Sequence, residues 1–531
     1  MTAAWDVLAA PREAGGRSLA ELLAALGDAE GRLARGEGGV GIERVALDSR
    51  RVRPGDLFVA VPGTARDGLA FAADAVAAGA VAVAVAEGRP LPDLAVPLVV
   101  SRDPRRFAGL AAAELAGRPS EAMTLVGTTG TAGKTTVTWL CESIARHAGA
   151  ATGLLGTIEH RIGGRRVPAD LTTPDAVTLQ DLLGEMRRAG VTHVFLEVSS
   201  HALALERLAG TALAVGVYTS LSRDHLDYHG DLAAYAEAKA RLFHEVLPAS
   251  SRGAFAVLNA EDPGVMEVAA ATPLPVVRFG GEGDVRAEEV VFHRAGLRAV
   301  LRLGGERVPV ESSLIGAPQL ANILAAAAVA WRLGFSTEAI ATGIRSLRRV
   351  PGRLDRVEAG QPFDVLVDYA HKPDALERVL VALRGLARRR LVVVFGCGGE
   401  RDRGKRPQMG EIATRLADVT IVTSDNPRGE DPLAIIEEIM AGAGRTSCAS
   451  VACAALGSES RGVVAVEPER RAAIARAIEI AEAGDLVVIA GKGHEDYQLV
   501  GAEKRAFDDR GEVCRALEGR GFAADGTEAG Q

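Results

Sequence analysis

The run GTTGTAGKTT at residues 127–136 carries the residue types that hold phosphate groups. Glycines and small hydroxyl side chains let backbone N–H groups approach phosphate oxygens, and a helix that begins directly afterwards adds the favourable field of its N-terminus. In such a loop Lys134 reaches the β- and γ-phosphates of a nucleotide, and Thr135 holds Mg²⁺. We therefore predict that ATP contacts Gly130, Thr131, Gly133, Lys134, Thr135 and Thr136. A turn without a ligand is the alternative, because Thr128 replaces the first glycine of the strict GxxxxGK[ST] pattern.

Two further polar residues could contact a metal ion. Glu197 ends a predicted strand over 192–198, and His225 lies in the polar segment 222–230. Their ordinary interpretations are a solvated carboxylate at the end of a strand and a structural histidine. From the residues alone, both interpretations stay open.

The surrounding pattern predicts the elements that position these residues. An apolar strand over 123–126 precedes the loop and a helix over 134–147 follows it, which is the order found in phosphate-binding units. Buried strands over 192–198 and 212–219 continue the alternation of strand and helix. We therefore predict a parallel sheet flanked by helices.

Stretches rich in Gly, Pro, Ser and Arg near 117–120 and 348–353 divide the chain into three segments. We predict an α/β fold with a small α/β domain, a central domain of the phosphate-loop type and a Rossmann-like domain, at residues 1–120, 121–349 and 350–531. The third domain lacks GxGxxG, so its fold implies no dinucleotide. The stretch 441–461, rich in Gly, Ala, Ser and Cys, is predicted to be a long surface loop.

Composition excludes several classes of protein. With 48% hydrophobic residues the chain is too apolar to be disordered, and its formal charge of −8 disfavours a general electrostatic grip on nucleic acid or an anionic membrane. Five cysteines without a CxxC pair favour neither a disulfide framework nor zinc. The longest apolar run, 75–86, is too short to span a bilayer. We expect a cytoplasmic monomer.

Seven motifs spread over nearly the whole chain together resemble the Mur ligases, which join an amino acid to a UDP-muramoyl precursor. Besides the phosphate loop they are LEVSSHAL (196–203), LSRDHLDYHG (221–230), VDYAHKPDALE (367–377), FGCGGERDRGKRP (395–407), TSDNPRGEDP (423–432) and AGKGHEDYQ (490–498). The last three, with LDSR (47–50) and PGDLF (54–58), resemble the branch that makes the UDP-N-acetylmuramoyl-tripeptide.

The resemblance implies an ATP-dependent ligase of peptidoglycan synthesis, and hence of cell-wall biogenesis, cell shape and cell division. A substrate carboxylate attacks the γ-phosphate, and an amine then displaces phosphate from the acyl phosphate. Lys239, which from its helical context alone is an ordinary solvated lysine, matches a carbamylated lysine that holds a second Mg²⁺. The catalytic and metal-contacting set implied is Thr135, Lys134, Glu197, His225 and Lys239.

The same resemblance assigns the other substrate contacts. Asn322, Arg353 and Asp368 match ATP contacts, with Tyr369 and His371 beside them, although a capped strand end with a polar loop is the alternative there. Positions matching UDP-sugar contacts, mostly in the first domain, are Leu47, Ser49, Thr64, Ala65, Arg66, Thr172, Thr173, Ser199 and Arg207. The sequence departs from the usual family residues at Ala132, Leu171, Leu205, Lys372 and the stretch 316–319.

The third domain is expected to select the amino acid. Its DNPR version is the one seen in enzymes that add meso-diaminopimelate, where Arg428 can clamp the distal carboxylate and Glu495 can meet the distal ammonium. The full set of matching positions is Arg401, Asp425, Asn426, Pro427, Arg428, Gly491 and Glu495. L-Lysine has no distal carboxylate and would leave Arg428 without its partner, at a cost of about 1–3 kcal/mol.

Other functions stay in view. The same reaction with L-lysine, another Mur-type or folylpolyglutamate-type ligase, and a non-catalytic ATP-binding relative are the alternatives to this assignment. The basic run at 401–406 could also be a patch for nucleic acid, but it lacks interleaved aromatic residues and lies in an acidic protein. We therefore expect no nucleic acid or membrane partner.

Overall fold

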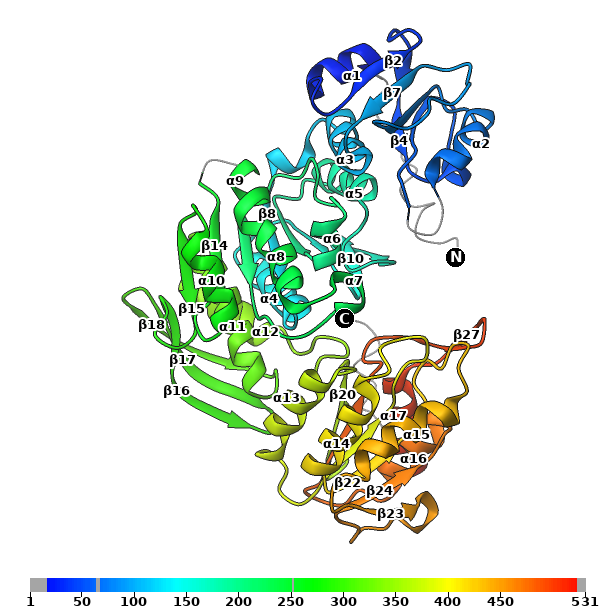
Figure 1. Cartoon of the computed structure of the whole chain (residues 1–531). Coiled ribbons are helices and arrows are strands. Elements are labelled where there is room, and N and C mark those ends of the chain that lie inside the picture. Colours follow the sequence, from blue (N-terminus) through cyan, green and yellow to red (C-terminus); the bar gives the residue numbers. More distant parts are fainter. Residues whose placement is uncertain (1–16, 64–66, 251–252, 523–531) are drawn as a thin grey trace. The chain divides into compact units, whose positions relative to one another are not determined.

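The computed structural model describes residues 17–63, 67–250 and 253–522, which form two compact units (Figure 1). Unit 1 is drawn from residues 1–286 and 325–343, and unit 2 from residues 287–324 and 344–531. Each of the predicted segments contains a main sheet of its own, so the expected α/β class is confirmed. The boundaries at 120 and 349 stay predictions.

The first sheet of unit 1 (blue in Figure 1) takes the strand order β2 (Arg32–Arg35), β7 (Leu98–Ser101), β6 (Ala82–Ala86), β5 (Asp56–Val59) and β4 (Arg44–Ala46). Its strands are parallel except where β2 joins β7. Alternate residues of β5 point to opposite faces, Leu57 toward one core and Phe58 toward the other. The first core includes residues of α1 (Leu19–Leu26) and α3 (Pro104–Leu115), and the second includes those of α2 (Ala72–Ala77).

The second sheet of unit 1 positions the phosphate loop. Its order is β11 (Arg165–Pro168), β10 (Glu159–Ile162), β9 (Thr152–Leu155), β12 (His193–Glu197), β8 (Thr124–Thr129), β13 (Val215–Tyr218), β14 (Phe255–Asn259), β15 (Val276–Phe279) and then the start of β16 (Val285–His293). The strands from β9 to β15 are parallel, and their side chains are almost all buried, as expected where helices cover both faces. The connecting helices include α4 (Lys134–His147), α5 (Ala176–Arg188), α8 (Leu232–Arg241) and α10 (Pro263–Ala271).

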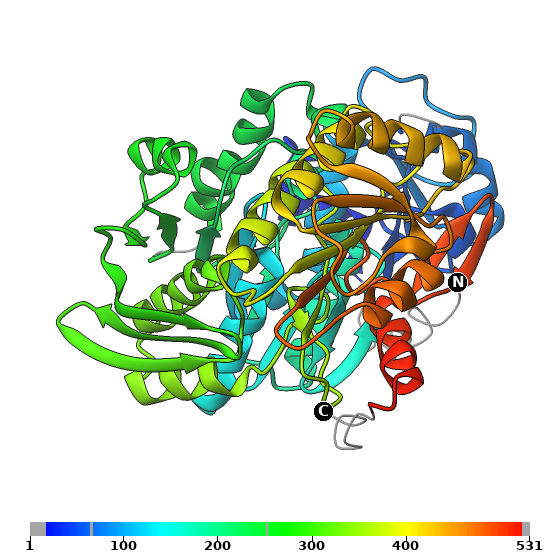
Figure 2. The same ribbon diagram turned by 90° about the horizontal axis from the view of Figure 1, so that it is seen from below.

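Unit 2 is built on a sheet with the order β19 (Asp355–Arg356), β20 (Asp364–Asp368), β25 (Leu486–Ala490), β21 (Leu391–Phe395), β22 (Val419–Val422), β24 (Val463–Val466) and β23 (Ala449–Ala452). All of these pairings are parallel except that of β19 with β20. Helices lie on both faces (Figures 1 and 2): α13 (Pro373–Arg384), α14 (Lys405–Leu416) and α15 (Pro432–Ala443) on one, α16 (Arg470–Glu479) and α17 (Asp509–Gly519) on the other.

Unit 2 also contains two antiparallel hairpins. One is formed by β17 (Gly296–Leu303) and β18 (Glu306–Ser312), and α11 (Ala317–Arg332) and α12 (Thr337–Ser346) follow it in the chain. The other, β26 (Tyr497–Val500) with β27 (Glu503–Ala506), follows the main sheet. None of the helices in the described part of the chain combines the length and apolar composition that a membrane-spanning helix needs.

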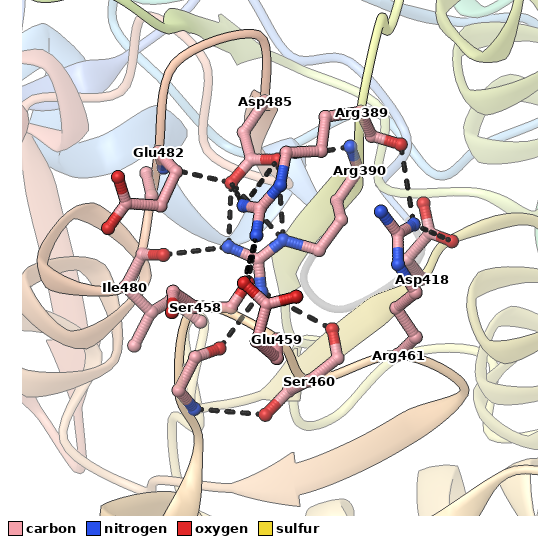
Figure 3. Close-up of polar contacts among 12 residues, drawn as sticks. Arg389, Arg390, Asp418, Ser458, Glu459, Ser460, Arg461, Ile480, Glu482 and Asp485 are labelled. Carbon is pink, nitrogen blue, oxygen red and sulfur yellow. Dashed lines mark hydrogen bonds and ion pairs between the residues drawn. The ribbon is translucent and has the colours of Figure 1, made fainter.

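The prediction of a long surface loop over 441–461 is wrong. The stretch begins inside α15 and contains the edge strand β23 and a short 3-10 helix (Cys453–Ala455). Its Gly- and Ser-rich composition hides a strand that exists because its backbone pairs with β24. Arg389 and Arg390 hold the end of the stretch by donating to the carbonyls of Ser458 and Gly457 at 2.7 and 2.9 Å (Figure 3).

Candidate active site

The phosphate loop connects the carboxyl end of β8 to the first turn of α4, as predicted. Two of its glycines are required by the backbone, because Gly130 and Gly133 have φ of 145° and 87°. At Gly130 a Cβ atom would also lie 1.9 Å from the Thr219 hydroxyl. The backbone conformation therefore explains these two glycines independently of any ligand. The N-terminus of α4 follows directly after the loop.

Two lysines meet at this loop. The Nζ atoms of Lys134 and Lys239 donate to the same carbonyl oxygen, that of Gly130, at 2.7 and 3.1 Å. Lys239 is 1% exposed and lies 4.6 Å from the centre of the Tyr235 ring, so its interpretation as a solvated lysine is wrong. The sequence separation of more than a hundred residues hides this convergence. Two cations beside one loop suit a polyphosphate.

Glu197 lies on the neighbouring strand β12 and is not a solvated carboxylate, since it is 1% exposed. Its Oε2 accepts hydrogen bonds from the hydroxyls of Thr135 and Thr157, both at 3.0 Å, and its Oε1 accepts one from the Thr157 N–H at 2.8 Å. Gly156 allows this approach, because a Cβ there would lie 2.4 Å from Oε1. Thr157 was not singled out in the sequence.

The oxygen atoms of Thr135 and Glu197 fit Mg²⁺. This ion prefers hard oxygen ligands and is typically held by one or two protein groups together with water and substrate phosphates. No group of three or more His, Cys, Asp or Glu side chains suited to a metal occurs among residues 17–63, 67–250 and 253–522. Phosphate oxygens and water would complete the ligands of an ion held by Thr135 and Glu197.

His225 belongs to a cluster of aromatic and imidazole rings. It has φ of 51°, its Nε2 lies 3.4 Å from Asp224 Oδ2, and its ring centre lies 4.8 Å from that of His201. The His201 ring also packs against Tyr228 and His229, at 4.3 and 5.5 Å. Burial lowers the pKa of His201, and the nearby charge of His229 lowers it further. Burial also lowers the pKa of His229, and there the charge of Lys239 adds to the effect. The i, i+4 spacing of His225 and His229 is the signal that could have found this cluster.

Four of the residues expected to contact the UDP-sugar belong to a hydrogen-bond network that includes Glu197. Thr173 donates from Oγ1 to the Glu197 carbonyl at 2.8 Å and accepts from the Ser199 N–H at 3.1 Å. Arg207 donates to the Thr173 carbonyl at 2.9 Å, and Thr172 accepts from the Thr157 hydroxyl at 3.1 Å. Burial lowers the pKa of Arg207, as expected for a guanidinium partly removed from water.

Two of the other predicted UDP-sugar residues, Leu47 and Ser49, lie beside the first sheet. Leu47 follows β4 and packs against the core of that sheet, and Ser49 begins a short 3-10 helix that ends at Arg51. Thr64, Ala65 and Arg66 lie outside the described residues. The structure thus groups the residues of the second sheet around Glu197 and places Leu47 and Ser49 beside the other sheet.

In unit 2, Asp368 ends β20 and caps the strand. Its carboxylate accepts the N–H groups of Leu354 and Ala370 at 2.7 and 2.8 Å, and burial raises its pKa although the Arg353 charge opposes that shift. Arg353 stacks at 4.6 Å over the ring of Tyr369. The capping that was considered as an alternative is therefore present, and it leaves the Arg353 guanidinium beside an aromatic face.

Two other predicted residues of this region are held by local contacts. His371 lies with its Nδ1 2.8 Å from the Tyr369 carbonyl oxygen. Asn322, on α11, is buried and donates to the Gln319 side chain at 3.0 Å. That contact forms one turn apart on the same helix, so the Gln319 departure from the family pattern is itself the partner of Asn322.

The residues expected to bind diaminopimelate come together at the carboxyl edge of the unit 2 sheet. Asn426 donates to Glu495 at 2.9 Å, and Arg428 donates to the Gly399 carbonyl at 2.7 Å. A Cβ placed on Gly398 would lie 3.0 Å from Arg428 and 3.9 Å from Arg401, so the two guanidinium-bearing side chains flank one glycine. Residues separated by more than 60 positions in the chain thus form one group.

Asp425 and Gly491 face each other in the same group. Gly491 has φ of 119°, and a Cβ there would lie 2.7 Å from Asp425 Oδ2, so glycine is required twice over. Within the part of the chain that the structure describes, the buried Oδ2 of Asp425 accepts no hydrogen bond. Pro427 lies between Asn426 and Arg428. The N–H of Arg428 donates to the carbonyl of Leu499, on β26, at 3.0 Å.

Lys492 is a member of this group that sequence analysis missed. It is 0% exposed, and its Nζ donates to Asn426 Oδ1 at 3.1 Å and pairs with Glu495 Oε2 at 3.3 Å. Its position inside the motif AGKGHEDYQ was the available signal.

Comparison with known proteins places these features in a family context. Models of the Mur ligase family, catalytic domain, the Mur ligase middle domain and the Mur ligase, glutamate ligase domain match residues 41–110, 128–330 and 352–493. Among curated relatives, proteins from Solibacter usitatus and Geobacter metallireducens are 45% and 46% identical over 480 and 483 residues. Each alignment covers 90% of this chain and 94% of the relative, and both relatives are named UDP-N-acetylmuramoyl-L-alanyl-D-glutamate--2,6-diaminopimelate ligase.

Solved structures agree with the sequence matches. A structure of a ligase of the same name has a TM-score of 0.67 and 32% identity, and the match covers 96% of this chain and 100% of that one. A MurF ligase from Thermotoga maritima in complex with ADP has a TM-score of 0.59 at 20% identity, covering 90% of this chain and 98% of that one. The second likeness is one of fold.

Proposed function

The chain belongs to the Mur ligase family, and we propose that it adds meso-diaminopimelate to the D-glutamate of UDP-N-acetylmuramoyl-L-alanyl-D-glutamate, with ATP as the energy source, in peptidoglycan precursor synthesis. It is an amide-forming ligase. The observation that carries the proposal is the meeting of Lys134, Lys239, Thr135 and Glu197 around the phosphate loop.

That arrangement supports activation of a carboxylate. A carboxylate resists attack by an amine until it becomes an acyl phosphate, and transfer of the γ-phosphoryl group requires positioning and neutralised charge above all. Lys134, the loop N–H groups and the N-terminus of α4 supply positive potential where charge develops. The amine then forms the amide bond, and phosphate leaves with the electrons of the broken C–O bond.

Metal binding at this loop is part of the proposal. Thr135 and Glu197 would hold Mg²⁺, which supplies charge neutralisation on the phosphate oxygens. From the family resemblance we propose that Lys239 carries a carbamate for a second Mg²⁺, with His225 as a neighbouring contact. The position of Lys239 supports that role, because its Nζ lies 3.1 Å from the Gly130 carbonyl oxygen of the phosphate loop, so a carbamate on it would lie beside the loop.

Selection of the amino acid is assigned to unit 2. Arg428 is proposed to bind the distal carboxylate and Glu495 the distal ammonium, with Arg401, Asp425, Asn426, Pro427 and Gly491 around them. Asn322, Arg353 and Asp368 are proposed as nucleotide contacts. Leu47, Ser49, Thr172, Thr173, Ser199 and Arg207 are proposed as contacts of the UDP-sugar.

Phosphate release tests the reaction. The purified protein is given ATP, Mg²⁺ and UDP-N-acetylmuramoyl-L-alanyl-D-glutamate, with meso-diaminopimelate, L-lysine or no amino acid. We expect strong release with diaminopimelate alone. Preference for lysine would overturn the role of Arg428 and keep the ligase, whereas no release with either amino acid would support a non-catalytic relative.

The carbamate has a separate test. Lys239→Ala is expected to abolish amide formation, and short carboxylates such as acetate are expected to restore part of it by supplying an oxyanion in the vacated space. Lys504→Ala, at an exposed lysine of β27, is the control and keeps full activity. Full activity of Lys239→Ala without any added carboxylate contradicts the assignment.

A further inference from the structure

Lys492 has no part in the roles assigned above, yet it is the lysine placed at the centre of the amino-acid group. A fully buried ammonium is costly unless it is paired and hydrogen-bonded. Its partners in unit 2 are Asn426 Oδ1 at 3.1 Å, Glu495 Oε2 at 3.3 Å and, more distantly, the Tyr497 ring at 5.6 Å. The lysine therefore contacts two of the residues proposed to bind diaminopimelate.

The first consequence concerns the amide of Asn426. Its Oδ1 accepts from Lys492 Nζ and from the Leu499 N–H, at 3.1 and 2.9 Å. Two donors on one side of the amide identify that atom as the oxygen, so the Nδ2 group must face the other way. It donates to Glu495 Oε2 at 2.9 Å. Lys492 and the Leu499 N–H thus together determine which end of Asn426 meets Glu495.

The second consequence concerns Glu495, whose two oxygens are used differently. Oε2 is occupied by Asn426 and Lys492, at 2.9 and 3.3 Å. As far as the chain is described, Oε1 has a single hydrogen-bond donor, the Tyr369 hydroxyl at 3.5 Å. The protein therefore holds the carboxylate by Oε2, and Oε1 can accept further hydrogen bonds from a ligand.

We propose that Lys492 is a positioning residue for recognition of the diamino acid: it orients Asn426 and Glu495 so that Oε1 of Glu495 is presented to the distal ammonium. This inference rests on the proposed function. Lys492 itself donates to protein atoms and does not need to touch the substrate. A buried ion pair kept for stability alone is the competing explanation.

The test separates the substrates. Lys492→Met keeps most of the apolar side chain and removes its charge, and KM for meso-diaminopimelate is expected to rise about tenfold or more, the effect of losing one charge-assisted hydrogen bond. KM for ATP and for UDP-N-acetylmuramoyl-L-alanyl-D-glutamate should stay unchanged. Lys504→Met is the matched control, because Lys504 also lies near the Tyr497 ring, at 4.1 Å, but on the exposed strand β27.

A double-variant cycle identifies the residue through which Lys492 acts. If Lys492 works through Glu495, the KM effects of Lys492→Met and Glu495→Gln combine to less than their sum in free energy. Full additivity, or a comparable rise in all three KM values, would overturn the inference.

Two further outcomes are distinguishable. Should Lys492→Met fail to fold, the double variant lacks both charges and is compared with Glu495→Gln: an equal KM supports the inference and a further increase overturns it. Absence of turnover by the unaltered protein with diaminopimelate refutes the proposed function, and with it the premise of this inference, before any variant is measured.

Discussion

The two edges of the unit 2 sheet use the same charged residue types in opposite ways. At the amino edge, Asp485 precedes β25 and Arg390 precedes β21, and both side chains are 0% exposed (Figure 3). Arg390 donates to Asp485 at 2.6 Å and also to the carbonyls of Gly457 and Ile480 at 2.9 and 2.7 Å. The Asp485 carboxylate accepts further hydrogen bonds from the N–H groups of Arg390 and Glu482.

At the carboxyl edge the polar groups are left partly unused. Asp425 Oδ2 is buried and, in the described residues, accepts no hydrogen bond, and Glu495 Oε1 has the long contact with Tyr369 already noted. A buried polar atom without a partner is costly, so such atoms mark places where a ligand or water completes the bonding. Both edges carry buried charged groups. What separates the structural cluster from the proposed binding site is whether the protein itself supplies all the hydrogen bonds of those groups.

The two edges also differ in acidity. Burial acts to raise the pKa of Asp485, but the hydrogen bonds of Arg390 and of the Glu482 N–H outweigh it and leave the pKa lowered. Burial dominates at Asp368, whose pKa is raised. Two aspartates beside paired strands of one sheet are thus shifted in opposite directions.

The largest effect is expected from Arg390→Met. It leaves Asp485 buried without its main partner, so the free energy of unfolding should fall by about 3–5 kcal/mol. Urea denaturation measures this loss. Loss of selectivity among amino acids in the folded variant would contradict the contrast between the two edges, because the amino edge would then take part in binding.

Arg428→Met should act at the other edge. We expect KM for diaminopimelate to rise by an amount corresponding to about 1.5–3 kcal/mol, the value of a hydrogen bond to a charged group. The free energy of unfolding should change little, since Arg428 is a partly exposed residue whose guanidinium binds a backbone carbonyl. Steady-state kinetics with diaminopimelate and L-lysine provide the check, and an equal loss with both substrates contradicts the assignment.

The opposite pKa shifts predict opposite responses to pH. Because the folded pKa of Asp485 is lowered, its stabilisation is complete above the ordinary value of 3.8 and is lost as pH falls through the folded value. Because that of Asp368 is raised, stability should decline as pH rises from 3.8 toward the folded value. Unfolding measured against pH should lose the first slope in Asp485→Asn and the second in Asp368→Asn; unchanged slopes contradict the shifts.

The smallest effect is expected at the rim of the amino-edge cluster. Arg461 pairs with Asp418 at 3.2 Å and is 47% exposed, so Arg461→Ala should cost about 0–1 kcal/mol. It is the matched control for Arg390→Met, because both remove an arginine from one cluster. A loss of unfolding free energy as large as that of Arg390→Met would show that burial does not determine the size of the effect in this cluster.

Local patterns predicted much of the fold. The helix over 134–147 has the predicted bounds, because the glycine-rich loop that precedes it and the residues that form it are close together in the chain. The edge strand β23 escaped prediction for the complementary reason. Its residues Ala449–Ala452 have little strand preference of their own and are ordered by pairing with β24.

The site divides in the same way. Lys134 and Thr135 could be assigned from spacing, since the loop, the helix start and both side chains lie within one short segment. Lys239 and Thr157 could not be assigned from local chemistry, because only the fold brings Lys239 beside the loop and Thr157 beside Glu197.

By itself, then, the sequence determined the α/β class, the phosphate loop and the family motifs, all of which depend on residues close together in the chain. The tertiary structure decided which charges are buried, as with Lys239 and Lys492, and which of them the protein satisfies. Arg390 and Asp485 lie 95 residues apart, and their ion pair exists because neighbouring strands begin at the same edge. Solvent exclusion and hydrogen-bond saturation are properties of the packed chain, so residue types alone do not contain them.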